Sequence, residues 1–196
     1  MEFNLKFSPL SGLWTFEKRS EIARWFNTNK FEEFYSTDNI NKKYYLMYTG
    51  GIDLYTTGAD QGYIECSFVN IGSCSYSSYY TETFDFSTIV APTTFTINNL
   101  GDNNLYPEIE IVKVTNGDIA IVNNTNGGKG FELSDLLNNE TVYIDNKRRQ
   151  IINDIVDTPR YDDFSGDYLE LVRGTNTLEI TGTCTLDVRY QYEFNG

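Results

Sequence analysis

Residues 107–124 read PEIEIVKVTNGDIAIVNN, and this stretch predicts two short strands joined by a tight turn. In residues 108–111, glutamate alternates with isoleucine, so one face of the first strand is polar and the other is apolar. Asn116-Gly117 is a turn signal, and residues 117–122 form a second apolar run. One polar and one buried face per strand is what two packed antiparallel sheets require.

Similar segments recur at short intervals through the second half of the chain. Glycine- and asparagine-rich turn signals separate nearly all of them, as in a β-sandwich. The predicted strands are 94–99, 106–114, 117–122, 129–134, 141–145, 148–156, 168–172, 177–181 and 183–194. The sequence therefore predicts a mainly β fold with an antiparallel sandwich at its C-terminal end.

The chain before this region predicts one helix among further strands. A strand over residues 2–7 comes first, and Thr15 is placed to cap a helix whose apolar stripe includes Ile22, Trp25 and Phe26. Segments 43–49 and 52–56 flank Gly50-Gly51, which predicts a two-residue hairpin.

A domain boundary is expected near residues 87–93. This division gives residues 1–88 as a helix with β-strands and residues 89–196 as the sandwich. Residues 74–86 are rich in serine and tyrosine, which predicts an extended linker or an edge strand.

The composition supports a core that needs no metal or disulfide. The chain has 196 residues, of which 40% are hydrophobic and 15% aromatic, and large rings bury much surface. Cys66, Cys74 and Cys184 are an odd number without CxxC spacing. We expect buried thiols, with a Cys66–Cys74 bridge as the alternative.

The formal charge of −13 argues against nucleic acid as a partner. Scattered lysines and arginines offer no basic face for a phosphate backbone, so we expect no nucleic acid. The one basic cluster, Lys147-Arg148-Arg149, is expected to pair with neighbouring acids. No run of 18 apolar residues occurs, so we expect no membrane-spanning segment.

The sequence contains no histidine, which excludes most common catalytic centres. Ser-His-Asp and Cys-His nucleophiles and HExxH zinc sites all require it. The remaining candidates are the carboxylate pairs of a glycosidase. Those pairs are Glu32 with Glu33, Glu108 with Glu110, and Asp162 with Asp163, and all are interpreted as solvated charge rather than as catalytic groups.

Two other possible sites also have simpler interpretations. Asp102-Asn103-Asn104 and Asn116-Gly117-Asp118 are rich in oxygen ligands for calcium, but neither continues into a complete binding loop, and both suit turns. Tyr76, Tyr79 and Tyr80 could stack on a sugar, yet half-buried rings on an extended segment are the simpler interpretation. We therefore expect no catalytic residue, no metal ligand and no cofactor.

The order of the segments resembles the distal tail proteins of tailed bacteriophages, the siphophage tail-component family with a galectin-like C-terminal domain. In the sandwich the resemblance rests on YPEI (106–109), GDIAIVN (117–123), VYID (142–145), GDYLEL (166–171), GTNTLEITG (174–182) and the last strand (186–194). Upstream it rests on RSEIARWF (19–26) and GYIECSF (62–68). The family often has proline where this chain has Arg173. Only about fifteen residues precede the helix, so residues 1–88 resemble the end of the family's ring-forming barrel, in a short member or a fragment.

The resemblance implies a structural, non-enzymatic role in the virion, at the phage tail tip or baseplate. It implies a homo-oligomer, a hexameric ring that links the tail tube protein to the tail hub, the tail-associated lysin and the receptor-binding proteins. The alternative is a carbohydrate-binding β-sandwich that recognises glycans of the host surface, because galectin-like sandwiches bind sugars through aromatic and polar side chains.

Overall fold

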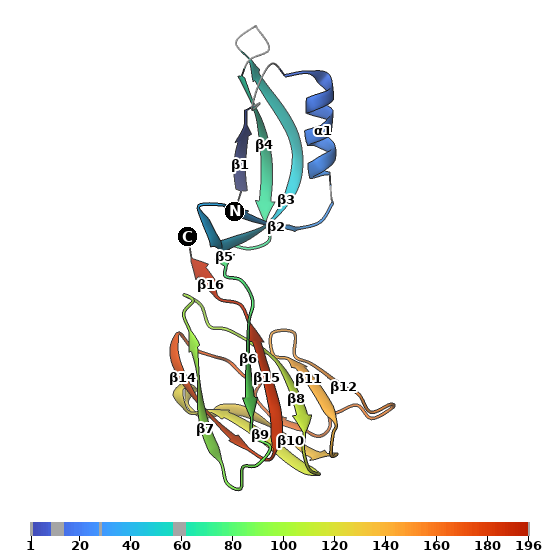
Figure 1. Cartoon of the computed structure of the whole chain (residues 1–196), viewed down its shortest axis with the longest axis vertical. Coiled ribbons are helices and arrows are strands. Elements are labelled where there is room, and N and C mark those ends of the chain that lie inside the picture. Colours follow the sequence, from blue (N-terminus) through green and yellow to red (C-terminus); the bar gives the residue numbers. More distant parts are fainter. Residues whose placement is uncertain (1, 9–13, 28, 57–61, 196) are drawn as a thin grey trace. The chain divides into compact units, whose positions relative to one another are not determined.

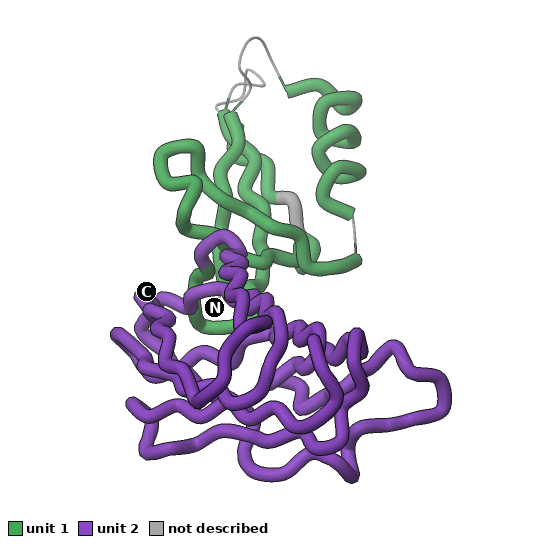
Figure 2. The backbone as a smooth tube through the Cα atoms, turned by 60° about the horizontal axis from the view of Figure 1, so that its bottom comes forward, with its two compact units in different colours: residues 1–76, 195–196 green, residues 77–194 purple. Residues whose placement is uncertain are grey.

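The computed structural model describes residues 2–8, 14–27, 29–56 and 62–195. The chain divides into two compact units, Met1–Tyr76 with Asn195–Gly196, and Ser77–Phe194 (Figure 2). Antiparallel strands dominate both units, and the described residues contain one α-helix (Figure 1). The predicted mainly β fold is confirmed. No helix in the described part of the chain is long and apolar enough to span a membrane.

The first unit combines a sheet with the helix. Its sheet has the order β1-β4-β3-β5, and β2 also pairs with β3. The elements are β1 (Glu2–Phe7), α1 (Phe16–Phe26), β2 (Glu32–Ser36), β3 (Asn39–Thr56), β4 (Gly62–Asn70) and β5 (Cys74–Tyr76). A small core of Trp14, Leu46, Ile64, Cys66 and Phe68 lies on this sheet.

Helix α1 begins where the sequence predicted. The Thr15 hydroxyl accepts a hydrogen bond from the Lys18 amide at 3.3 Å, which satisfies one of the unpaired donors of the first turn. Glu17 lies in that turn, where the helix dipole favours a negative charge. The predicted strand over residues 2–7 is also confirmed.

The predicted hairpin at Gly50-Gly51 is wrong. β3 continues through both glycines, and β4 pairs with β3 on both sides of them. Between the pairs Tyr48–Phe68 and Ile52–Cys66, three residues of β3 face one residue of β4, so the glycines belong to a bulge. Gly50 has a φ of +92°, which explains the glycine there.

The second unit is a sandwich of two five-stranded antiparallel sheets. One sheet has the order β13-β10-β9-β14-β7 and the other the order β12-β11-β8-β15-β6. The strands are β6 (Tyr80–Asp85), β7 (Thr93–Asn99), β8 (Glu108–Lys113), β9 (Gly117–Asn123), β10 (Lys129–Leu136), β11 (Thr141–Asp145), β12 (Gln150–Asn153), β13 (Phe164–Gly166), β14 (Gly174–Thr181) and β15 (Cys184–Tyr190). A 3₁₀ turn, η1 (Asn124–Asn126), follows β9. The last strand, β16 (Glu193–Asn195), lies outside both sandwich sheets and follows β5 in the sheet order of the first unit.

The inner faces of both sheets form one apolar core. Ile109 and Ile111 of β8 are fully buried, as are Ile119 and Ile121 of β9. The alternation that predicted the sandwich therefore places its apolar residues inside. Each such side chain contributes about 1.5–3 kcal/mol by leaving water.

Several details differ from the sequence-based expectations. β6 pairs with β15, so residues 80–85 belong to the sandwich as an edge strand, ahead of the expected boundary near residues 87–93. Residues 168–172 form no regular strand, although Leu171 makes an isolated bridge with Leu105. All three cysteines are buried and are present as thiols.

Candidate interaction site

The first unit contains a groove of about 340 Å³ that is lined mainly by aromatic and aliphatic side chains. The groove combines residues from four strands and the helix. Its lining residues are Leu5, Phe7, Trp25, Phe26, Glu32, Glu33, Phe34, Leu46, Tyr48 and Phe68. Such a lining favours apolar protein side chains over a polar small molecule.

The inner wall of the groove is packed, whereas its rim is open to solvent. Phe26 contacts Phe7 and Phe68, with ring centroids 5.3 Å and 5.0 Å apart. Trp25 stacks on Phe26 at 4.7 Å but is 68% exposed, and Phe34 is 38% exposed. No residue of α1 is fully buried. Clustered exposed aromatics of this kind mark contact surfaces for other proteins.

The two carboxylates in the groove form ion pairs at the surface. A Glu33 oxygen lies 2.9 Å from Lys43 Nζ, and a Glu32 oxygen lies 2.9 Å from Lys30 Nζ. Both glutamates are solvent-exposed. They therefore give the groove a charged edge rather than a pair of groups for proton transfer.

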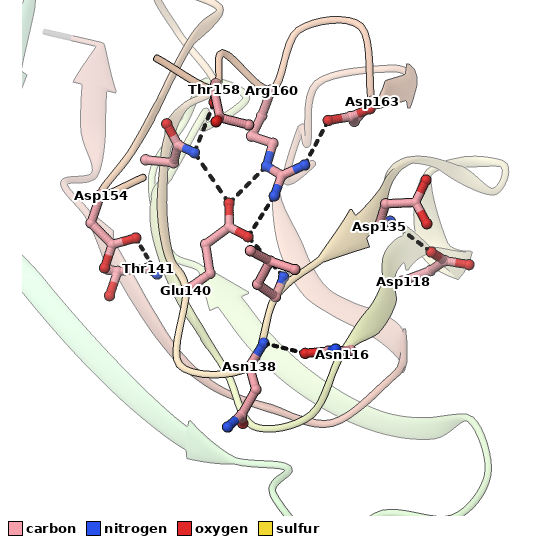
Figure 3. A network of polar contacts seen from close by, with 12 residues as sticks. Asn116, Asp118, Asp135, Asn138, Glu140, Thr141, Asp154, Thr158, Arg160 and Asp163 are labelled. Atoms are coloured by element: carbon pink, nitrogen blue, oxygen red, sulfur yellow. Dashed lines mark hydrogen bonds and ion pairs between the residues drawn. The ribbon is translucent and has the colours of Figure 1, made fainter. Parts of the chain in front are cut away.

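A buried ion pair fixes the long connection between β12 and β13 in the sandwich. Glu140 accepts hydrogen bonds from Arg160 Nε and Nη2, both at 2.7 Å, and Arg160 Nη1 also bonds Asp163 at 2.8 Å (Figure 3). The Glu140 side chain is fully buried, and that of Arg160 is 6% exposed. Burial opposes the ionised form of Glu140, but hydrogen bonds from Arg160, the Leu137 amide and Asn153 outweigh it and lower its pKa.

A second carboxylate joins three loops at one end of the sandwich. Glu170 accepts hydrogen bonds from Asn104 and from the Tyr106 hydroxyl, each at 2.8 Å, and from Asn126 at 3.1 Å. Lys129 Nζ lies 3.4 Å away. These hydrogen bonds, led by that of Asn104, lower the pKa of Glu170 to about 2. The carboxylate therefore stays ionised and holds the loops together.

Comparison with known proteins assigns the sandwich to a family. Residues 76–190, more than half of the chain, match the family model described as the phage tail C-terminal domain. The chain belongs to this phage tail family. It is thus a structural protein of the phage tail and a component of the virion.

Two further comparisons agree with this family. The chain is 24% identical over 173 residues to the SPbeta prophage-derived uncharacterized protein YomH of Bacillus subtilis (strain 168), covering 88% of this chain and 68% of that protein. The fold is similar to the crystal structure of the SPP1 Dit protein, with a TM-score of 0.71 and 14% identity. That match covers 97% of this chain and 78% of the SPP1 protein, which is described as a paradigm of the hub adsorption apparatus. The expected resemblance to distal tail proteins is confirmed at the level of the fold.

In this phage tail protein, one member of each remaining carboxylate pair makes a structural contact. On β8, Glu110 is exposed beside the buried Ile109 and Ile111, and Glu108 accepts a hydrogen bond from Arg189 at 2.9 Å. Asp163 belongs to the Arg160 network, and its neighbour Asp162 is exposed. Glu110 and Asp162 are thus solvent-exposed, whereas Glu108 and Asp163 are half-buried and paired with arginines rather than simply solvated.

The oxygen-rich segments tie loops to one another. Asn116 accepts a hydrogen bond from the Asn138 amide at 2.7 Å, and Asp118 accepts one from the Asp135 amide at 2.9 Å (Figure 3). Asn104 donates to Glu170. Among the described residues, no three cysteine, aspartate or glutamate side chains form a group that could hold a metal.

Two residues of the basic cluster pair with acids as expected. Lys147 Nζ lies 2.8 Å from Glu193, and Arg148 lies 3.5 Å from Asp145. The guanidinium of Arg149 stands 5.9 Å from the centre of the Tyr168 ring.

The three tyrosines considered for sugar stacking contact other side chains of the protein. Tyr76, in the first unit, meets Tyr45 edge-on at 5.3 Å. In the second unit, the Arg189 guanidinium covers the Tyr79 ring at 4.1 Å, and Tyr80 contacts Tyr192 at 5.1 Å. Because their faces are partly occupied, these rings do not form an open stacking platform.

Sequence reasoning missed the groove and the Glu140–Arg160 pair. The sequence predicts the apolar stripe of the helix, but the contribution of this stripe to an open rim depends on β2, which is not among the predicted strands. Glu140 precedes β11 and Arg160 follows β12, so they are twenty residues apart in two different connections, and no periodic pattern links them.

Proposed function

We propose that this chain is a distal tail protein that self-associates through its first unit into a ring at the tail tip. The observation that carries the proposal is the open aromatic groove, with Trp25 and Phe34 exposed at its rim. Exposed aromatic clusters on a soluble unit favour association, because burying each ring removes a large apolar area from water. By family resemblance, the ring has six copies.

The charge distribution supports different roles for the two units, with self-association through the first unit and docking of other proteins on the second. Residues 1–76 contain nine acidic and seven basic residues, a net charge of −2, whereas residues 77–194 contain nineteen and eight, a net charge of −11. Self-association through the nearly neutral unit costs little electrostatic repulsion. The acidic sandwich then serves to dock other proteins of the tail tip.

The proposed partners follow the family resemblance. They are the tail tube protein on one side of the ring, and the tail hub with its lysin and the receptor-binding proteins on the other. We propose no catalytic activity, because one carboxylate of each candidate pair (Glu33, Glu108 and Asp163) is engaged in an ion pair or hydrogen bond within the protein. Glycan recognition has less support, because Arg189 and Tyr192 partly occupy the faces of Tyr79 and Tyr80.

The test is the mass of the assembled species for the wild-type chain and for matched variants. The variants Trp25→Glu and Phe34→Glu place a charge on the groove rim without opening a core cavity, because both side chains are exposed. Val156→Glu is the control, since Val156 is 83% exposed on the sandwich. We expect the wild type and Val156→Glu to form six-chain species and both groove variants to shift towards monomer. A wild type that stays monomeric alone and with tail tube protein, or equal dissociation of the control, would contradict the proposal.

A further inference from the structure

β7 is an edge strand without the usual protection against pairing with another strand. It forms the end of its sheet and pairs only with β14 among the described strands, in unbroken register from Thr93 to Asn99. Its sequence, TTFTINN, contains no charged residue and no proline. Natural sheets usually guard such edges with charges, prolines, bulges or short strands.

The other three edges of the sandwich are guarded. β13 has three residues, and β12 has four residues between Arg149 and Asp154. β6 carries Glu82 and Asp85. With seven residues and no charge, β7 therefore differs from the other three edge strands of the same unit.

Two contacts show which backbone groups of β7 face outward. The Asn98 carbonyl accepts a hydrogen bond from the Tyr192 hydroxyl at 3.0 Å, so this carbonyl points away from β14. The Thr177 amide, opposite Thr96, bonds the Thr125 hydroxyl at 2.9 Å on the far side of β14. Because backbone groups alternate along an antiparallel strand, Thr94 and Thr96 direct their N–H and C=O groups to the open edge.

Apolar side chains extend the edge at both ends. Val90 precedes β7 and is fully exposed, and Leu100 follows it and is 67% exposed. Phe95 and Ile97 are buried in the core and hold the strand in place. The edge thus offers backbone partners flanked by two apolar contacts, which suits a strand added from outside.

We propose that the β7 edge accepts an extended, positively charged segment of a different tail protein as an additional strand. This inference rests on the proposed tail-tip function. Residues 86–101 carry no charge, but the sandwich around them has a net charge of −11. A second sandwich would be repelled, whereas a basic segment would be attracted.

The test compares hydrogen exchange in the free protein and in purified tails of the phage that encodes it. The Thr94 and Thr96 amides are expected to exchange at least about tenfold more slowly in tails, because an added strand would bond them. Exchange at the free rate would overturn the inference alone. A chain that is absent from purified tails would overturn the proposed function and the inference with it.

A photo-crosslinking residue in place of Thr96 identifies the occupant. A crosslink in tails to a basic segment of another protein supports the proposal, and a crosslink to a second copy of this chain overturns it.

A matched pair of variants adds an independent readout. Thr96→Lys is expected to lower incorporation into tails at least about tenfold, whereas Thr177→Lys, directly opposite on the inner strand β14, is expected to incorporate normally. Equal incorporation of both variants would also overturn the proposal.

Discussion

Buried charged side chains in the sandwich stabilise the fold only when each has its ion-pair and hydrogen-bond partners. Glu140 and Arg160 lie inside the protein, where an ion without its partner is far more costly than in water. Glu170 is held by donors from separate loops and keeps 15% of its side chain exposed. Both carboxylates are therefore expected to influence stability much more than the surface ion pairs do.

Arg160→Ala is expected to destabilise the protein by about 3–5 kcal/mol, because it leaves the Glu140 carboxylate buried without a counterion. The matched control is Arg148→Ala, because Arg148 is 78% exposed and its ion pair with Asp145 is solvated. We expect that control to change stability by less than about 1 kcal/mol. The measurement is urea unfolding, and equal effects of the two substitutions would refute the role assigned to Glu140.

Glu170→Gln is expected to remove a pH-dependent contribution to stability. The pKa of Glu170 falls from an ordinary 4.5 to about 2 in the folded state. A depressed pKa stabilises the folded protein above the unfolded pKa, and this stabilisation is lost as pH falls through the folded pKa. The difference between wild type and variant should be about 2–3 kcal/mol at neutral pH and should vanish near pH 2. Tyr106→Phe, which removes one donor, should give a smaller effect of the same sign, and unfolding measured at several pH values checks both.

Elements with local signals were predicted well, and elements that depend on distant pairing were not. The Thr15 cap and the apolar stripe define α1, and the alternating isoleucines define β8. The hairpin prediction failed at Gly50-Gly51 because β4 pairs with β3 on both sides of the bulge, and that pairing overrides the local turn preference. β13 has three residues, and its register with β10 is set by the sheet rather than by its own sequence.

Pairing between β9 and β10 requires a glycine at position 130. A Cβ atom on Gly130 would collide with the Ile121 carbonyl and Val122 Cα, both of which are backbone atoms. Gly130→Ala is therefore expected to destabilise the sandwich by about 1–3 kcal/mol. Gly72→Ala is the control, since its Cβ would lie 3.2 Å from the Tyr76 hydroxyl, at the end of a side chain that can move. Thermal unfolding of the two variants is the measurement. An unchanged melting temperature for Gly130→Ala would contradict the close approach of Gly130 to the β9 backbone.

At the scale of the whole chain, the sequence was sufficient for the fold class and the family, because segment order and strand spacing are global features. The candidate contact surface needed the structure, because Trp25, Phe34 and Phe68 come together only when α1, β2 and β4 assemble. We infer that a nearly neutral unit builds a ring at the tail tip while the acidic sandwich docks partners.

Cryo-electron microscopy of purified tails tests this claim most directly. We expect the chain to lie at the distal end of the tail tube as a closed ring, with the first units in contact with one another around the axis. Density for the chain along the tube or in the head, or a tail-tip ring in which only the sandwiches touch one another, would contradict it.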